Sequence, residues 1–319
     1  MKYPVNSSII DKKYQTMRNG ILEKIPMIAA ERLVPGGDYD RHGRGRWDKR
    51  RIQNGFAACS RPIMQMKSPY KAKGLKHMKI GLFADLHYAK GMTSGTRQCG
   101  QSLLKLQRIL CKLSGADLLV NLGDALNEGA SPRDNAENLR AFQAVLASSG
   151  KPVYHVLGNH DTHAIPRPAL ISSGPEGGYS FMAGETSCLV LDGNYVKNGL
   201  SYYETLWDWT DSALPEGQIH WLQRELEKAQ GPVIVFCHQN LDIRPGDPHV
   251  ISNADRVERI LEGSGKVAAV IQGHYHPGYF QRIHGIPYYT LKAVCEGEGC
   301  PCALLETGSG EPSLQWMEA

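Results

Sequence analysis

Eight polar side chains able to bind a metal or carry a proton follow apolar, strand-like runs in this 319-residue sequence. They are two carboxylates, one amide and five imidazoles: Asp85, His87, Asp124, Asn159, His160, His238, His274 and His276. Carboxylate and amide oxygens and imidazole nitrogens suit borderline or hard divalent cations. Taken singly, Asp85 and Asp124 could be helix caps, and His238 could be a strand-end histidine bonded to backbone. Together, the eight predict a site for two divalent ions.

The residue types also suggest a reaction. Two cations about 3.5–4 Å apart repel each other, so we expect a carboxylate such as Asp124 to lie between them. Neutral imidazoles fix the geometry without cancelling the positive charge that a phosphate needs. A water bridging both ions becomes a hydroxide nucleophile near neutral pH, and His160 can donate to a phosphoryl oxygen. The set therefore favours hydrolysis of a phosphate ester or diphosphate.

Strands and helices alternate along the part of the chain that carries these residues. Apolar residues at helical spacing predict helices over 102–113, 135–147, 216–229 and 255–261. If the strands share one sheet, their carboxyl ends bring the polar residues to one edge, and the alternation predicts an α/β fold. Gly158 allows the sharp turn before Asn159. The predicted strands before the polar residues are 79–84, 117–122, 153–157, 233–236 and 267–271.

Further short strands and an aromatic insert complete the predicted domain. Two hairpins are expected over 179–191 and 279–291, and edge strands over 303–306 and 313–316. The insert 194–214 could stack a nucleobase, but packing over the sheet is the favoured interpretation because aromatic rings usually serve packing. Its rings are Tyr195, Tyr202, Tyr203, Trp207 and Trp209.

The amino-terminal segment differs from the rest in charge. Residues 1–77 contain 17 Lys/Arg and 6 Asp/Glu, a net charge of +11, whereas the whole chain has +4. We predict a basic, disordered extension at 1–77 and one domain at 78–319, because the extension lacks a regular apolar pattern. A basic arm for nucleic acid or acidic lipid is the alternative. The acidic remainder makes nucleic acid an unlikely substrate.

The composition of the sequence bears on the expected location of the protein. The sequence has no run of about 20 apolar residues and no secretory pattern, so we expect no membrane association. A chain of this kind is not expected to hold a disulfide framework, and we predict a cytoplasmic location. Cys111, Cys188 and Cys237 are expected in the core, and 300–302 (Cys-Pro-Cys) in a surface turn.

The motif order resembles the calcineurin-like metallophosphoesterase superfamily. The blocks are Asp85-x-His87, Gly123-Asp124, Gly158-Asn159-His160-Asp161, His238 and Gly273-His274-x-His276, and they cover about 78–298. The resemblance implies a four-layer α-β-β-α sandwich with its metal site at the carboxyl ends of the strands. It implies one ion on Asp85, His87, Asp124 and His276, and another on Asp124, Asn159, His238 and His274. It also implies that His160 contacts the scissile phosphate or leaving group and that Asp161 orients it.

Within that superfamily, 189–193, 218–226 and 274–291 look most like the manganese-dependent ADP-ribose/CDP-alcohol diphosphatases, although that branch often has glutamine at the place of His87. Asn127 stands where purple acid phosphatases have an iron-binding tyrosine, so Mn²⁺ is expected, with Fe²⁺ or Zn²⁺ as alternatives. The implied substrate is a small nucleotide-like phosphodiester or diphosphate, with Arg97 and Arg244 as candidates for a distal phosphate. A phosphomonoesterase and an inactive scaffold are the alternatives.

Overall fold

The computed structural model describes residues 77–165, 178–202, 208–242, 247–308 and 310–319. Contacts divide the chain into two units, Met1–Cys59 and Ser60–Ala319, and every described residue belongs to the second. The predicted extension 1–77 lies outside the described residues except for His77, so this domain boundary stays a prediction.

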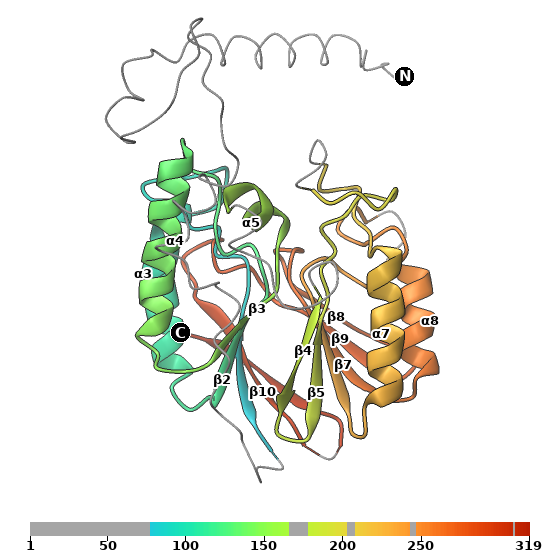
Figure 1. Ribbon diagram of the computed structural model, residues 1–319. Helices are drawn as coiled ribbons and strands as arrows, with labels where there is room; N and C mark the ends of the chain where they lie inside the picture. The colour runs from blue at the N-terminus through green and yellow to red at the C-terminus, as the bar shows by residue number, and fades with distance from the viewer. Residues whose placement is uncertain (1–76, 166–177, 203–207, 243–246, 309) are drawn as a thin grey trace, which may run out of the picture. The chain divides into compact units, whose positions relative to one another are not determined.

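The first sheet has five strands in the order β11-β10-β1-β2-β3 (Figure 1). Strands β1, β2 and β3 are parallel, and β10 is antiparallel to both of its neighbours. The parallel strands bring their carboxyl ends to the same edge. Their bounds are β1 Lys79–Phe83, β2 Leu118–Asn121, β3 Val153–His155, β10 Pro301–Glu306 and β11 Ser313–Glu318.

The second sheet has six strands in the order β4-β5-β6-β7-β9-β8. Strands β5, β6, β7 and β9 are parallel, and the edge strands β4 and β8 are antiparallel to their neighbours. The bounds are β4 Tyr179–Ala183, β5 Thr186–Val190, β6 Val233–Cys237, β7 Val267–Gln272, β8 Tyr279–Ile283 and β9 Ile286–Thr290.

Three buried clusters join the layers. Val120 of β2 and Phe236 of β6 belong to the cluster between the sheets, whereas Leu119 and Val235 belong to the outer clusters under the helices. Successive strand residues face opposite sides, so both faces of these strands are apolar. Helices α3 and α4 cover the first sheet, and α7 and α8 cover the second (Figure 1). The helices are α3 Ser102–Lys112, α4 Pro132–Ala147, α5 Asn159–Ala164, α7 Glu216–Lys228 and α8 Ala254–Gly263, with a 3₁₀ turn η2 at Cys99–Gln101.

The predicted α-β-β-α class is confirmed, with one change that matters for the site. The strands before the polar residues do not share one sheet, since β1, β2 and β3 lie in the first and β6 and β7 in the second. Their carboxyl ends still meet, because the two sheets pack face to face through the central cluster. The site therefore lies where the two sheets adjoin.

Three local predictions were wrong. Helix α4 begins at Pro132, three residues before the predicted start, because Ser131 Oγ accepts a hydrogen bond from the Asp134 N–H at 3.2 Å. The cysteine at 111 is exposed, whereas Cys300 and Cys302 are buried around the start of β10 and not in a surface turn.

No helix among the described residues is long and apolar enough to cross a membrane.

Candidate metal centre

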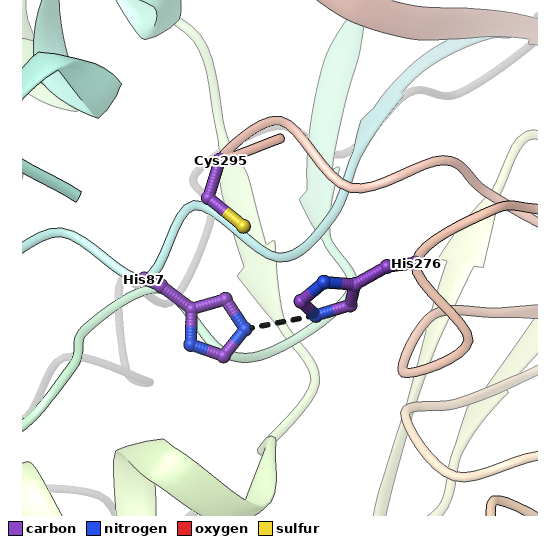
Figure 2. A group of neighbouring side chains, drawn as sticks. All are labelled: His87, His276 and Cys295. Carbon is purple, nitrogen blue, oxygen red and sulfur yellow. Dashed lines mark hydrogen bonds between the residues drawn. The ribbon is translucent and has the colours of Figure 1, made fainter. Parts of the chain in front are cut away.

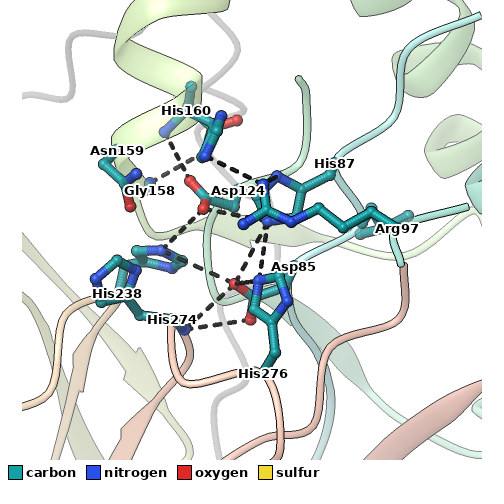
Figure 3. Close-up of polar contacts among 12 residues, drawn as sticks. Asp85, His87, Arg97, Asp124, Gly158, Asn159, His160, His238, His274 and His276 are labelled. Atoms are coloured by element: carbon teal, nitrogen blue, oxygen red, sulfur yellow. Dashed lines mark hydrogen bonds and ion pairs between the residues drawn. The ribbon is translucent and has the colours of Figure 1, made fainter. Parts of the chain in front are cut away.

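Four residues leave their strands with left-handed backbone. The φ angles of Asp85, His87, Asp124 and His274 are 55°, 46°, 49° and 69°. Non-glycine residues adopt such angles at an energetic cost and do so often at functional sites. The N–H groups of Asp85 and His87 donate to the carbonyls of Gly123 and Asp124 at 3.0 and 2.8 Å, which joins the loops after β1 and β2. These turns direct the side chains toward one another (Figure 3).

The first group of donors surrounds Asp85. His87 Nε2 lies 3.9 Å from Asp85 Oδ1, 3.4 Å from Asp124 Oδ2 and 3.2 Å from His276 Nε2. His276 Nε2 is also 3.7 Å from Asp85 Oδ1. Two donors bound to one ion at about 2.1 Å lie roughly 3–4 Å apart, so these four residues have the spacing of a shared ion.

The second group of donors shares Asp124. His238 Nε2 lies 3.3 Å from Asp124 Oδ2, and the ligand atoms of Asp124, His238 and His274 lie within 4.8 Å of one another. Oδ2 of Asp124 thus lies near both His87 and His238. This is the place of a bridging carboxylate.

Three buried polar atoms in the site have no hydrogen-bond partner in the described part of the chain, and this bears on whether the site can hold metal ions. Among the described residues, the buried atoms Asn159 Oδ1, His238 Nε2 and His274 Nε2 have no hydrogen-bond partner. His238 Nε2 makes an ion-pair contact with Asp124 Oδ2 at 3.3 Å. Buried polar atoms without partners cost free energy and call for an explanation. Cations held by these atoms would satisfy all three, so the donor set fits metal ions.

Glycines allow the loops to approach each other. A Cβ on Gly158 would lie 2.1 Å from Asp124 Oδ1 and 2.2 Å from its backbone nitrogen. A Cβ on Gly123, whose φ is 100°, would lie 2.5 Å from His238 Nδ1. No other residue type fits at either position without displacing a donor.

Hydrogen bonds of their Nδ1 atoms fix the orientation of two imidazole rings. His238 Nδ1 donates to the Leu122 carbonyl at 2.8 Å, and His276 Nδ1 is bonded to Glu296 Oε1 at 2.8 Å. Both rings therefore turn Nε2 toward the site, as expected for metal-binding histidines. Sequence reasoning missed Glu296, because an isolated glutamate carries no motif.

His160 lies on the first turn of α5, at the edge of the donor set. Its backbone N–H donates to Asp124 Oδ1 at 2.8 Å, and its Nδ1 is bonded to Glu128 Oε2 at 3.2 Å. The guanidinium of Arg97 lies 3.3 Å from His160 Nε2 and 3.4 Å from His87 Nδ1. His160 Nε2 and Arg97 thus lie on one side of the centre (Figure 3).

The carboxylate of Asp161 contacts the backbone at the start of α5, and its expected role in orienting His160 stays a prediction. Its carboxylate accepts hydrogen bonds from the backbone N–H groups of Leu126 and Gly158, both at 3.1 Å. It therefore holds the turn before α5, and Glu128 is the carboxylate bonded to the imidazole of His160. Glu128 was missed by the sequence analysis, since it lies outside the recognised blocks.

The electrostatics differ among the donors. Burial lowers the pKa of His87 and of His274 well below the usual value, which leaves both neutral and ready to bind a cation. Burial opposes charge on Asp124 and His238 as well, but their mutual attraction outweighs it. The pKa of Asp124 is held well below normal and that of His238 is raised to about 9. A cation would replace that proton on His238.

Cys295 is a further neighbour of the first donor group. Its Sγ lies within 4.8 Å of the ligand nitrogens of His87 and His276 (Figure 2). Burial raises the pKa of this thiol, so it borders the centre as a neutral group. No spacing pattern in the sequence pointed to it.

The predicted metal ligands and His160 all come together in the structure. Two other histidines have partners outside the donor set: His155 is buried beside Asn121, and His284 pairs with Glu258 and Glu262. Arg244, predicted as a phosphate contact, lies outside the described residues.

Residues 78–278 match the family model described as calcineurin-like phosphoesterase. The match spans more than half of the chain, and this protein belongs to that family. It is thus a metal-dependent phosphate ester hydrolase, as the resemblance implied.

The chain is also similar to individual relatives. It is 27% identical to a manganese-dependent ADP-ribose/CDP-alcohol diphosphatase from Arabidopsis thaliana, over 70% of this chain and 86% of the relative. A protein of the same name from Oryza sativa is 26% identical, over 70% and 84%. The fold is shared with a dimetal phosphatase from Danio rerio, with a TM-score of 0.60, 20% identity, and coverage of 76% of this chain and 98% of that chain. A yellow lupin purple acid phosphatase gives a TM-score of 0.54 at 12% identity, covering 76% and 51%.

Proposed function

We propose that this protein uses two divalent ions, Mn²⁺ foremost, to hydrolyse a phosphodiester or diphosphate bond of a small nucleotide-like substrate. The observation that carries the proposal is the set of unpartnered buried donors that cluster with Asp124 (Figure 3). Two relatives named as manganese-dependent diphosphatases support the choice of metal and substrate class.

The two donor groups would hold one ion each. Asp85, His87, Asp124 and His276 form one set, and Asp124, Asn159, His238 and His274 form the other. Ions bound there supply positive charge for the phosphoryl oxygens and lower the pKa of the attacking water.

The chain's own residues complete the chemistry. His160 Nε2 can donate a proton or hydrogen bond to a phosphoryl or leaving-group oxygen, while Glu128 holds its Nδ1. Attraction to Asp124 and Glu128 outweighs burial and raises the pKa of His160, which favours the donor form. Arg97 adds a fixed positive charge beside it.

A substrate panel tests the proposal. The protein with Mn²⁺ is assayed on ADP-ribose, a CDP-alcohol, bis-p-nitrophenyl phosphate and p-nitrophenyl phosphate. We expect Mn²⁺-dependent turnover of the first three to exceed that of the monoester. A preference for the monoester would indicate a phosphomonoesterase instead. Absence of bound metal by elemental analysis would indicate an inactive scaffold.

A His160→Ala variant tests the role of the imidazole. It keeps the backbone bond to Asp124, so we expect normal metal content and a loss of turnover of about 10²–10⁴-fold. His220→Ala, at an exposed histidine of α7, is the matched control. Unchanged turnover in His160→Ala would remove this imidazole from the reaction.

A further inference from the structure

A second imidazole bonded to a carboxylate lies beside His274, one of the predicted metal ligands. His249 Nδ1 lies 2.7 Å from Asp247 Oδ1, and its ring centroid is 5.0 Å from that of His274 at an interplanar angle of 70°. The His249 side chain is 25% exposed, so part of its ring faces solvent beside a buried member of the donor set.

The backbone fixes His249 against the loops of the centre. The Asn240 N–H donates to the His249 carbonyl, and the Ile251 N–H donates to the Asn240 carbonyl, both at 3.0 Å. The Asn240 side-chain amide donates to the Gly273 carbonyl at 3.0 Å. Asn240 follows His238 by two residues, and Gly273 precedes His274. The position of His249 is therefore set by the same two loops that carry metal ligands.

Trp209 extends this side of the centre. Its ring centroid lies 5.1 Å from that of His249 and 5.7 Å from that of His274. The Ser252 N–H donates to the Ser212 carbonyl at 2.7 Å, which ties the Trp209 segment to the His249 segment. Trp209 is half-buried, so it offers apolar ring surface next to the polar His249.

This arrangement suits a ligand with a planar organic group. An aromatic ring packs on a flat base through dispersion and π contacts. Because His249 Nδ1 is engaged by Asp247, Nε2, on the other side of the ring, is the atom left to meet a ligand oxygen or hydroxyl. Neither His249 nor Trp209 is needed to complete the donor set at His274.

We propose that His249 and Trp209 form the wall that binds the nucleoside part of the substrate, with Trp209 packing on the base and His249 Nε2 bonded to a sugar or phosphate oxygen. This inference rests on the proposed function, since it names the part of a nucleotide-like substrate that this side of the site recognises. Asp247 is the positioning residue for His249.

Paired substrates test the wall. We compare ADP-ribose with methyl p-nitrophenyl phosphate, which lacks a nucleoside, in His249→Ala and Trp209→Ala. We expect KM for ADP-ribose to rise about tenfold with kcat little changed, and KM for the methyl ester to stay within about twofold. Calorimetry with AMP should show the same loss of affinity. Trp209→Phe should retain most of the binding, and Asp247→Asn should reproduce part of the His249→Ala effect.

Three outcomes would contradict the proposal that His249 and Trp209 bind the nucleoside. Equal changes on both substrates, loss of bound Mn²⁺ in His249→Ala, or no binding of AMP to the unaltered protein would each do so. His284→Ala, at an exposed histidine of the β8–β9 hairpin, is the matched control. If the unaltered protein binds AMP but hydrolyses no ester, the proposed function fails, while the AMP affinities of the variants still decide the wall.

Discussion

The backbone N–H of His160 donates a hydrogen bond to Asp124 Oδ1 at 2.8 Å. The other oxygen of the same carboxylate lies 3.4 Å from His87 Nε2 and 3.3 Å from His238 Nε2. The residue that we propose to contact the phosphate therefore also fixes the orientation of the carboxylate shared by both donor groups. Removing the His160 side chain leaves this bond in place, so chemistry and metal binding can be separated by mutation.

Replacing Asp124 by asparagine should disrupt both ion positions. The neutral amide cannot bridge two cations, so we expect loss of bound Mn²⁺ and at least about a 100-fold fall in turnover. In the unaltered protein, Mn²⁺ at 100 times its Kd should raise the free energy of unfolding by about 2.7 kcal/mol per site. Thermal unfolding with and without Mn²⁺ checks this. A variant that Mn²⁺ stabilises as strongly as the unaltered protein would contradict the bridging role.

Glu296→Gln should weaken metal binding through His276. The glutamate holds His276 Nδ1 at 2.8 Å, and loss of such an outer contact lowers metal affinity by about 10–100-fold. Competition with a fluorescent chelator measures this change. Glu298→Gln, two residues further and exposed, is the control and should leave the affinity unchanged.

Glu128→Gln should reduce turnover without removing metal. Although burial acts to raise it, the hydrogen bond from His160 holds the pKa of Glu128 below its usual value, so the carboxylate stays charged beside the imidazole. We expect kcat to fall about tenfold or more, with Mn²⁺ content unchanged by elemental analysis. If Glu128→Gln adds nothing to the defect of His160→Ala, the two act as one unit; full additivity would argue against that.

Gly158→Ala should harm both the fold and the centre. The new methyl group would meet Asp124 at 2.1–2.2 Å, so the loop after β3 or the carboxylate must move. We expect the free energy of unfolding to fall by about 1–3 kcal/mol and Mn²⁺ content to fall with it. Gly115→Ala has open space around its Cβ and should be close to neutral. Denaturant unfolding of the two variants distinguishes a local clash from a general effect of alanine.

Stability should fall in acid because of His155. Burial lowers its pKa from 6.5 to about 4, so the unfolded chain binds a proton more readily than the folded chain between these values. The stabilisation of the folded chain by neutral His155 is complete above about pH 6.5 and is lost as the pH falls toward 4. Between pH 7 and 5, the loss of this stabilisation lowers the free energy of unfolding by about 2 kcal/mol. Urea unfolding of His155→Gln should show a pH slope smaller by that amount, whereas the exposed His284→Gln should not.

The cluster of donor residues could be located from the sequence because these residues follow directly after predicted strands. Each metal ligand follows an apolar run, and every such run forms a strand or leads directly out of one. Gly158 was recognisable as a turn residue beside Asn159. The division into two sheets was not predictable from periodicity, because buried parallel strands such as β2 and β6 are apolar on both faces.

The supporting residues could not be predicted in this way. Glu128 and Glu296 contact His160 and His276 from other segments of the chain, and neither lies in a pattern with a fixed spacing. Asp161 lies in a recognisable block, but the sequence did not indicate that its carboxylate accepts hydrogen bonds from the backbone N–H groups of Leu126 and Gly158. Side-chain direction at the start of α5 decides this, and the sequence does not record it.

The left-handed backbone of Asp85, His87, Asp124 and His274 has a consequence for laboratory evolution. Glycine tolerates positive φ without the penalty of roughly 1–2 kcal/mol that a side chain brings. A population selected only for heat resistance, with no phosphate ester to consume, should therefore gain glycine at these four positions early. Thermal tolerance and catalysis would then diverge in successive generations, because the residues that we propose to hold the ions also adopt strained backbone angles.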